Sequence, residues 1–226
     1  MGAKHRVALY GGTFDPVHLG HLEVARGVSE LFEIEKVVFI PAQLAPHKLG
    51  RQVTAAVHRY AMLALATQND PKLSISTFEL DDPARRYTVD TISHFQTVWG
   101  ETKELFFIMG ADSWDEITTW REWERLLKIT NHIVATRPGY EINEPPLNLQ
   151  NQIVDLRGGS QSVRQLTQLT TGTGIFFTDV VMNDVSATAI RHLASEGRID
   201  ELEQLVPESV SEYITKYQIY RNSNEA

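Results

Sequence analysis

A short apolar run, a pair of glycines and a helical pattern follow one another near the start of the chain. Val7–Tyr10 is the apolar run, and Gly11-Gly12 come directly after it. Beyond the glycines, apolar residues recur at the spacing of one helix face: Leu19, Leu22, Val24, Ala25, Val28 and Leu31. A buried strand that turns through glycines into a helix is the first half of a β–α–β unit, which constrains the chain to an α/β fold.

The rest of the sequence continues this alternation. Apolar runs with the length of buried strands lie at Val37–Pro41, Leu73–Ser76, Leu105–Gly110, His132–Thr136 and Ile175–Val180. Helical patterns cover 19–32, 54–67, 88–99 and 114–128. We therefore predict a doubly wound, Rossmann-like parallel sheet with helices on both faces. Ligands of such sheets bind beyond the carboxyl ends of the strands, which here are Gly11, Pro41, Gly110 and Arg137.

We predict a single domain, 1–226, because no linker divides the sequence. We expect 141–174 to be an irregular insertion or flap, since a connection of this length is unusual in a compact domain. Residues 188–220 are expected to form a C-terminal helical extension, with Pro207 at the start of one helix.

Composition argues against several classes of protein. The net charge of -8 disfavours a broad nucleic-acid interface, and the absence of cysteine excludes thiol nucleophiles and thiolate metal sites. No apolar run approaches the ~18 residues of a membrane span, and the N-terminus lacks the apolar core of a signal peptide. We expect a cytoplasmic protein without nucleic-acid or membrane partners. Composition leaves the oligomeric state open, with a homo-oligomer as one alternative.

Two histidines stand where the first helix is expected to begin. His18 and His21 are three residues apart, which places them close to one face of the first turn. A helix N-terminus attracts anions, and imidazoles there can donate hydrogen bonds to phosphate oxygens. Two other interpretations remain: His18 can be a capping or surface residue, or the pair can be metal ligands. The second lacks the carboxylate of a His-Glu-x-x-His zinc helix.

The string His18-Leu19-Gly20-His21 resembles the His-x-Gly-His mark of the nucleotidyltransferase family. The longer string from Gly11 to His18 is similar to one branch, the nicotinate mononucleotide adenylyltransferases of NAD synthesis. Further strings in the family's order are Pro46-His47-Lys48, Tyr87-Thr88 and 185–191, Val-Ser-Ala-Thr-Ala-Ile-Arg. The resemblance implies that ATP and nicotinate mononucleotide are the partners and that deamido-NAD and pyrophosphate are the products.

The resemblance also implies roles for individual residues. Catalytic contacts to the phosphates are expected from His18, His21, Lys48 and Arg191. ATP is expected at Gly11, Gly12, Thr13, Phe14, Gly110, Asp112, Ser186 and Thr188. The mononucleotide is expected at Asp15, Lys48, Tyr87, Thr88 and Trp120, with Trp120 on the pyridine ring. Mg²⁺ is expected as the cofactor, bound through phosphates and water and not through protein side chains.

Each of these residues also has a purely structural interpretation. Thr88, Ser186 and one of Asp112 or Ser113 can be helix N-caps. Lys48 can be a solvated loop residue, and Trp120 can belong to the core. Trp123 competes with Trp120 for the stacking role, because both would lie on nearly the same face of a helix over 114–128.

Two rival functions follow from the same sequence. The first is transfer to another phosphate acceptor, such as nicotinamide mononucleotide, phosphopantetheine, or a sugar or glycerol phosphate. The second is a non-catalytic nucleotide-binding regulator. A regulator of the dinucleotide type calls for Gly-x-Gly-x-x-Gly after the first strand, whereas this chain has Gly11-Gly12 followed by His-x-Gly-His.

Overall fold

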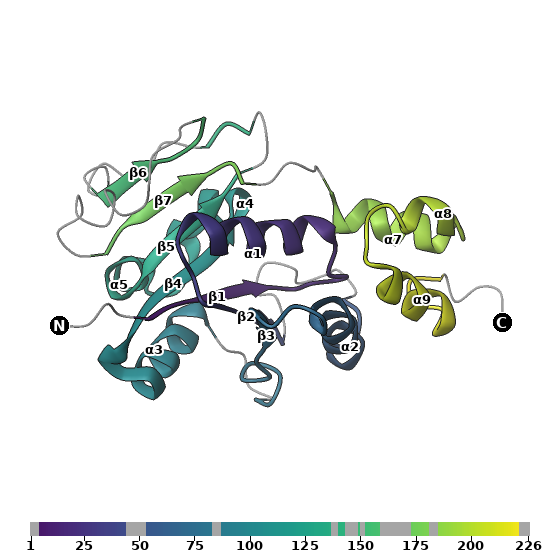
Figure 1. Ribbon diagram of the computed structural model, residues 1–226, viewed down its shortest axis with the longest axis horizontal. Helices are drawn as coiled ribbons and strands as arrows, with labels where there is room; N and C mark the ends of the chain where they lie inside the picture. Colours follow the sequence, from purple (N-terminus) through teal and green to yellow (C-terminus); the bar gives the residue numbers. More distant parts are fainter. Residues whose placement is uncertain are drawn as a thin grey trace.

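The computed structural model describes residues 5–43, 53–82, 87–136, 140–142, 149, 152–158, 173–180 and 185–221. A seven-stranded sheet in the order β3-β2-β1-β4-β5-β7-β6 forms its centre, and every neighbouring pair of strands is parallel. The strands are β1 (His5–Gly12), β2 (Lys36–Pro41), β3 (Leu73–Ile75), β4 (Lys103–Gly110), β5 (Asn131–Ala135), β6 (Ile153–Asp155) and β7 (Ile175–Thr178). Figure 1 shows the strands running from the N-terminal end of the molecule towards the C-terminal helices. The predicted α/β fold is confirmed.

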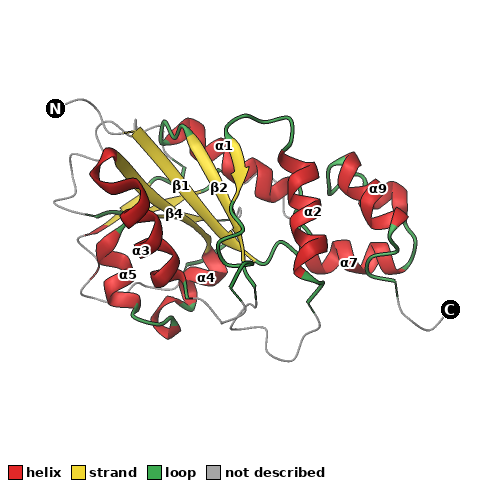
Figure 2. Ribbon diagram, turned by 90° about the horizontal axis from the view of Figure 1, so that it is seen from below, coloured by secondary structure: helices red, strands yellow, loops and turns green. Residues whose placement is uncertain are grey.

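Alternate residues of the strands supply two separate cores. In β1, Ala8 and Tyr10 face one core while Val7 and Leu9 face the other. Helices α1 (Leu19–Leu31) and α2 (Ala56–Thr67) pack into the first core. The second is covered by α3 (Thr88–Trp99), α4 (Ala111–Asp115) and α5 (Trp123–Ile129), which Figure 2 shows together. Two 3₁₀ turns, η2 (Gly100–Thr102) and η3 (Ile117–Thr119), lie between these helices in the sequence.

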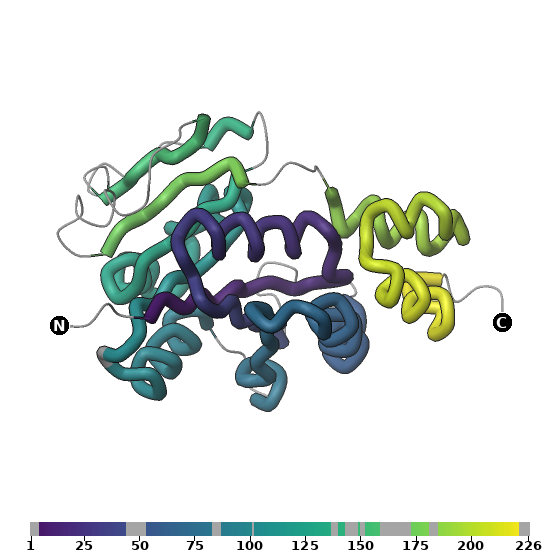
Figure 3. Tube along the Cα trace, in the orientation of Figure 1, coloured from purple at the N-terminus to yellow at the C-terminus, as the bar shows by residue number. Residues whose placement is uncertain are grey.

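Three C-terminal helices lie beyond the carboxyl ends of the strands. They are α7 (Ala187–Ser195), α8 (Ile199–Leu202) and α9 (Glu208–Lys216), and Pro207 is the N-cap of α9 as predicted. Figure 3 shows this part of the chain near the start of α1 and at the opposite end from the N-terminus. The Nδ1 atom of His58 in α2 lies 2.9 Å from the hydroxyl of Tyr213 in α9. The extension therefore borders the edge of the sheet at which ligands are expected.

Two features differ from the sequence expectations. Strand β6 lies inside 141–174, so this segment is not irregular throughout. The continuous helix expected over 114–128 is wrong, since α4, η3 and α5 replace it. The Thr119 hydroxyl donates to the carbonyl of Glu116 at 2.7 Å, and Glu122 has a φ of 51°. Both features interrupt helical geometry, as expected of a threonine that competes for backbone groups and a residue in the left-handed region.

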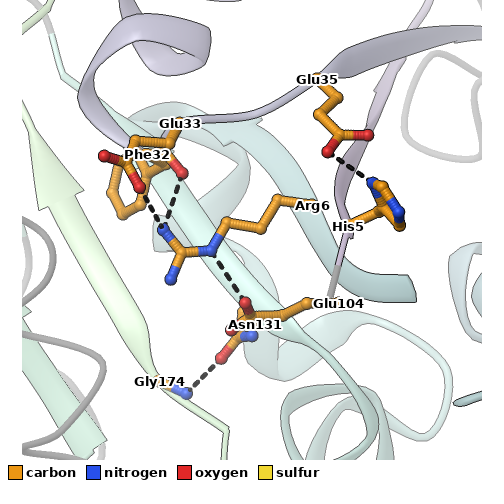
Figure 4. A network of polar contacts seen from close by, with 8 residues as sticks. All are labelled: His5, Arg6, Phe32, Glu33, Glu35, Glu104, Asn131 and Gly174. Atoms are coloured by element: carbon orange, nitrogen blue, oxygen red, sulfur yellow. Dashed lines mark hydrogen bonds and ion pairs between the residues drawn. The ribbon is translucent and has the colours of Figure 1, made fainter. Parts of the chain in front are cut away.

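The opposite, amino end of the sheet is held by an arginine. Arg6 Nε donates to Glu104 Oε2 at 2.8 Å, and Arg6 Nη1 donates to the carbonyl of Phe32 at 3.0 Å (Figure 4). A further contact of 3.8 Å joins Arg6 to Glu33, which begins the turn into β2. These contacts join β1, β4 and the end of α1 at the edge of the sheet opposite the one at which ligands are expected, so we assign Arg6 to stability.

A buried histidine in β5 makes the stability of this fold depend on pH. His132 is fully buried, and desolvation lowers its pKa from 6.5 to about 3. The folded protein keeps the imidazole neutral while the unfolded chain binds a proton below pH 6.5, so stability is lost as the pH falls from 6.5 towards 3. Between pH 7 and pH 5 this loss is about 2 kcal/mol.

His132→Leu is expected to remove that dependence. In urea unfolding at pH 7 and pH 5, the wild type should lose about 2 kcal/mol more than the variant. The other titrating groups are common to both proteins and cancel in the comparison. An identical loss in the two proteins would contradict the assignment.

Candidate active site

The site lies where the order of the strands reverses. Strands β2 and β3 follow on one side of β1 in the sheet. Strands β4, β5, β7 and β6 follow on its other side. Such a switch point leaves a crevice at the carboxyl ends of the two central strands. Gly12 ends β1 and is paired with Pro41, and Gly110 ends β4 and is paired with Ala135. The predicted meeting of strand ends is thus confirmed for the ends that the structure describes.

Aromatic rings occupy the space that a side chain would need at Gly11 and Gly12. A Cβ on Gly11 would lie 2.9 Å from the ring of Phe107, and a Cβ on Gly12 would lie 2.8 Å from the ring of Phe14. Phe14 has a φ of 50° and is buried, and its ring packs against Phe39 at 5.3 Å. The rings of Phe107 and Phe14 thus pack directly on the backbone at the end of β1, and any residue other than glycine at either position would displace them.

The two histidines are brought together as the sequence predicts. His18 is the N-cap of α1 and is only 7% exposed, and its ring stacks on that of His21 with the centroids 3.6 Å apart. The backbone N–H of His18 donates to His21 Nδ1 at 3.2 Å. Because Nδ1 is the acceptor, the neutral imidazole of His21 carries its proton on Nε2. His21 is thereby prepared to donate that proton in a hydrogen bond to an anion at the N-terminus of α1.

The closing motif of the sequence reaches the same place. Arg191 Nη1 donates to the carbonyl of Asp15 at 2.7 Å, and Arg191 Nη2 donates to the Thr188 hydroxyl at 3.1 Å. Ser186 is the N-cap of α7 as predicted, although its hydroxyl makes no capping bond to the described residues. A Cβ on Gly20 would lie 3.2 Å from His18 Nδ1 and 3.6 Å from Val185 Cβ. The start of α7 therefore lies beside His18, and Arg191 of α7 is bonded to the loop that precedes α1.

A buried arginine beside this turn is not among the residues predicted from the sequence. Arg59 in α2 is 1% exposed and donates to the carbonyls of Thr13 at 2.7 Å, Thr54 at 2.9 Å and Gln43 at 3.4 Å. Burial lowers its pKa, while the nearby Asp15 carboxylate acts in the opposite direction. One signal was available, because Arg59 precedes the apolar Met62 and Leu63 by three and four residues and so lies on their face of the helix.

Tyr220, the partner of Asp15, is likewise not among the residues predicted from the sequence. The Tyr220 hydroxyl donates to Asp15 Oδ1 at 2.7 Å, and the backbone N–H of Thr54 donates to Asp15 Oδ2 at 3.2 Å. Asp15 is only 6% exposed. No local pattern links two residues that stand this far apart in the chain.

Two of the residues expected at the mononucleotide, Tyr87 and Trp120, lie in neighbouring segments. Trp120 meets the Phe107 ring edge to face at 6.4 Å, and the Arg121 guanidinium lies 4.8 Å from the centroid of the Tyr87 ring. The start of α3 and the Trp120–Arg121 segment are thus neighbours, next to the ring that faces Gly11. Trp123 begins α5 whereas Trp120 follows η3 in extended geometry, so the idea that both share one helix face is wrong.

Two of the structural interpretations of site residues are also corrected. Tyr87 and not Thr88 is the N-cap of α3, and Gly110 and not Asp112 or Ser113 is the N-cap of α4. A Cβ on Gly110 would lie 2.6 Å from Asp112 Oδ1, so the carboxylate of Asp112 lies over the end of β4. Asp112 therefore lies at the carboxyl end of β4 without serving as the N-cap of α4.

Some predicted residues lie outside the described part of the chain. They are Pro46, His47, Lys48, Arg137 and most of 141–174. Within the described ranges, no group of three or more metal-ligating side chains is placed to hold a metal ion. None of the helices described there has the length and apolar character needed to cross a membrane.

Comparison with known proteins agrees with this geometry. The profile of the cytidylyltransferase-like family matches residues 9–193. The "Probable nicotinate-nucleotide adenylyltransferase" of Thermoanaerobacter sp. (strain X514) is 40% identical over 225 residues, which cover 100% of this chain and 99% of that protein. A protein of the same name from Thermus thermophilus is 36% identical over 216 residues, 96% of this chain and 100% of the other.

Solved structures give the same result for the fold. The Plasmodium falciparum nicotinic acid mononucleotide adenylyltransferase complexed with NaAD matches with a TM-score of 0.71 at 17% identity, covering 96% of this chain and 97% of that one. The fold likeness and the curated relatives thus point the same way. The chain belongs to the cytidylyltransferase-like family and, within it, to the nicotinate-nucleotide adenylyltransferases.

Proposed function

We propose that this chain transfers AMP from ATP to nicotinate mononucleotide and releases pyrophosphate. The observation that carries the proposal is the stacked His18–His21 pair at the N-terminus of α1, beside Arg191 and the switch point of the sheet. The names of relatives that align over nearly the whole chain support the same reaction. We place the reaction in the cytoplasm, where a chain without cysteine and its nucleotide substrates are expected to occur.

The chemistry calls for positioning and charge neutralisation. An oxygen of the mononucleotide phosphate forms a bond to the α-phosphorus of ATP, while the bond from that phosphorus to the pyrophosphate oxygen breaks. The attacking group is already anionic, so no side-chain nucleophile and no general base are needed. His18 and His21 donate hydrogen bonds to the transferring phosphate, whose charge grows in the transition state. Lys48, Ser186 and Arg191 hold the polyphosphate together with the N-terminus of α7.

The remaining residues orient the two nucleotides. Gly11, Gly12, Thr13 and Phe14 form the floor for ATP, and Thr188 faces its phosphates. Gly110 and Asp112 receive the ribose of ATP. Asp15, Lys48, Tyr87, Thr88 and Trp120 receive the mononucleotide, with Trp120 on the pyridine ring. Holding both reactants near the geometry of attack is worth at most about 7–11 kcal/mol of the barrier.

Mg²⁺ is proposed as the cofactor, carried by ATP. The described residues offer it no carboxylate cluster, and Asp15 is buried with both carboxylate oxygens bonded within the protein. These side chains do not fit a direct metal site, so phosphates and water would be its ligands. When bound in this way, the ion neutralises neighbouring phosphate oxygens.

Pyrophosphate release with Mg-ATP tests the proposal. Nicotinate mononucleotide and nicotinamide mononucleotide are compared at equal concentration, and strong preference for the acid is expected. Equal or inverted rates would mean that nicotinamide mononucleotide is also, or preferentially, a substrate. Release with neither mononucleotide would require another phosphate acceptor. Retention of ATP without any release would favour the rival interpretation of a nucleotide-binding regulator.

Trp120→Ala tests the stacking role. We expect KM for the mononucleotide to rise more than KM for ATP, because the side chain is proposed to cover the pyridine ring and not the adenine. Trp99→Ala is the matched control, since Trp99 packs on Phe95 at the far end of α3 from Tyr87. Steady-state kinetics with each substrate varied in turn measure both constants. An equal rise in the two KM values would assign Trp120 to packing alone.

A further inference from the structure

The C-terminal helices contact both ends of the turn that carries His18. We call residues 185–221 the C-terminal unit. At the far end of the turn, the backbone N–H of Leu19 donates to the carbonyl of Leu205 at 2.9 Å. At the near end, Arg191 donates to the carbonyl of Asp15 at 2.7 Å, and Tyr220 donates to the carboxylate of the same residue at 2.7 Å. His18 lies between these attachment points.

The bond from Tyr220 fixes the orientation of a buried carboxylate. Asp15 Oδ1 accepts from Tyr220, while Oδ2 accepts from the Thr54 N–H at 3.2 Å. Burial and, to a smaller extent, the charge of Asp15 raise the pKa of Tyr220, so its hydroxyl stays protonated and remains a donor. A hydrogen bond to a buried charged group is among the stronger ones in a protein. The last described turn of the chain therefore holds the first loop of the site.

We propose that Tyr220 is a positioning residue for adenylyl transfer. Through its hydrogen bond to Asp15 it fixes the position of the turn that carries His18 relative to the phosphates of the substrates. The C-terminal unit thereby acts as a clamp on the site. The inference rests on the function proposed above. Tyr220 touches neither substrate nor reacting atoms in this role. Arg191 takes part in both functions, because its guanidinium carries N–H groups beyond those bonded to Asp15 and Thr188.

The expected consequence is a loss in kcat and not in folding. The other side of the turn stays bonded through Arg59 to the carbonyl of Thr13, so loss of one hydroxyl loosens the turn without releasing it. Misplacement of a catalytic group by a fraction of an ångström to 1 Å costs about 10- to 100-fold in rate. Tyr220→Phe in the full-length chain should therefore lower kcat about tenfold or more, with KM for both substrates within about threefold of wild type.

Tyr213→Phe is the matched control. Tyr213 lies in α9, and the substitution removes a comparable hydrogen bond. The partner in that bond is His58 in α2 and not a residue of the turn that carries His18. Its kcat should equal that of the wild type. Unfolding curves of both variants fix an assay temperature at which each is folded. A Tyr220→Phe enzyme with kcat within about twofold of wild type, or a Tyr213→Phe enzyme with an equal loss, would overturn the inference.

A double-mutant cycle separates a clamp from a general loss of stability. If Tyr220 acts through Asp15, adding Tyr220→Phe to Asp15→Asn should cost much less than it does in the wild-type background. Additive losses in kcat would mean that the two residues act independently, which contradicts the clamp.

Imidazole resonances in NMR spectra give a readout that needs no substrate. The signals of His18 and His21, assigned with His18→Ala and His21→Ala, should shift in Tyr220→Phe and stay in place in Tyr213→Phe. Unchanged signals in both variants would overturn the inference. If the wild-type protein released no pyrophosphate with either mononucleotide, the proposed function would fail, whereas this comparison would still test whether Tyr220 positions the histidines.

Discussion

His18→Ala is expected to lower kcat by about 10²- to 10³-fold, the usual loss of one donor that stabilises charge in a transition state. The ring of His18 is packed face to face on that of His21 at the N-cap of α1, so its removal takes away a donor and also a support for the second imidazole. Substrate binding should change less, because the helix N-termini and Arg191 remain. Steady-state pyrophosphate release measures the loss, and circular dichroism checks that the fold is kept.

His94→Ala is the control for this variant. His94 is exposed on α3 and stacks on Phe78 with the ring centroids 3.9 Å apart. The substitution therefore removes a comparable ring contact away from the site. It should keep wild-type turnover. His18→Ala/His21→Ala together should cost less than the product of the single losses, since the two rings act as one unit. Normal turnover in His18→Ala would remove this residue from the mechanism.

Arg59→Met is expected to lower the free energy of unfolding by about 3–5 kcal/mol. The guanidinium bonds three backbone carbonyls, of Thr13, Gln43 and Thr54, and it lies near the Asp15 carboxylate. Methionine fills the space of the stem but leaves these acceptors without donors and the buried carboxylate without its cation. Urea unfolding at pH 7 measures the change.

Arg26→Met provides the comparison for Arg59. Arg26 is an exposed residue of α1 whose ion pair with Asp70 spans 3.1 Å, and loss of such a pair costs about 1 kcal/mol or less. Arg59→Lys should fall between the two, because it keeps the charge but not the planar set of donors. A loss in Arg59→Met no larger than that in Arg26→Met would mean that water or a rearranged backbone satisfies the carbonyls.

The sequence predicts the sheet well because the strands are buried on both faces. A strand such as β4 must then be apolar at nearly every position, and the run Leu105–Gly110 is visible without any neighbour. The His18–His21 pair is predictable for a related reason, since its spacing and its place at a helix start are local properties. β6 could not be predicted in this way, because a strand of three residues, Ile153–Asp155, is too short for its apolar pattern to stand out.

The parts of the site that could not be predicted depend on contacts between distant residues. The break at Trp120 follows from the left-handed Glu122 and from the hydroxyl of Thr119, which outweigh an acceptable helical spacing. Tyr220 and Asp15 are 205 positions apart in the chain, so their contact depends on how the C-terminal helices pack against the sheet. Arg59 looks like an ordinary helix residue until the loops whose carbonyls it binds have closed around it.

The attachment of the C-terminal unit to the turn at Asp15 has a consequence for synthesis on the ribosome. The chain emerges from its N-terminus, so the histidines and most of the sheet are available for folding long before Tyr220. Leu205, Arg191 and Tyr220, which fasten the turn, are all synthesised long after His18. A nascent chain that has not yet reached Arg191 therefore holds His18 and His21 without the three contacts that fasten their turn.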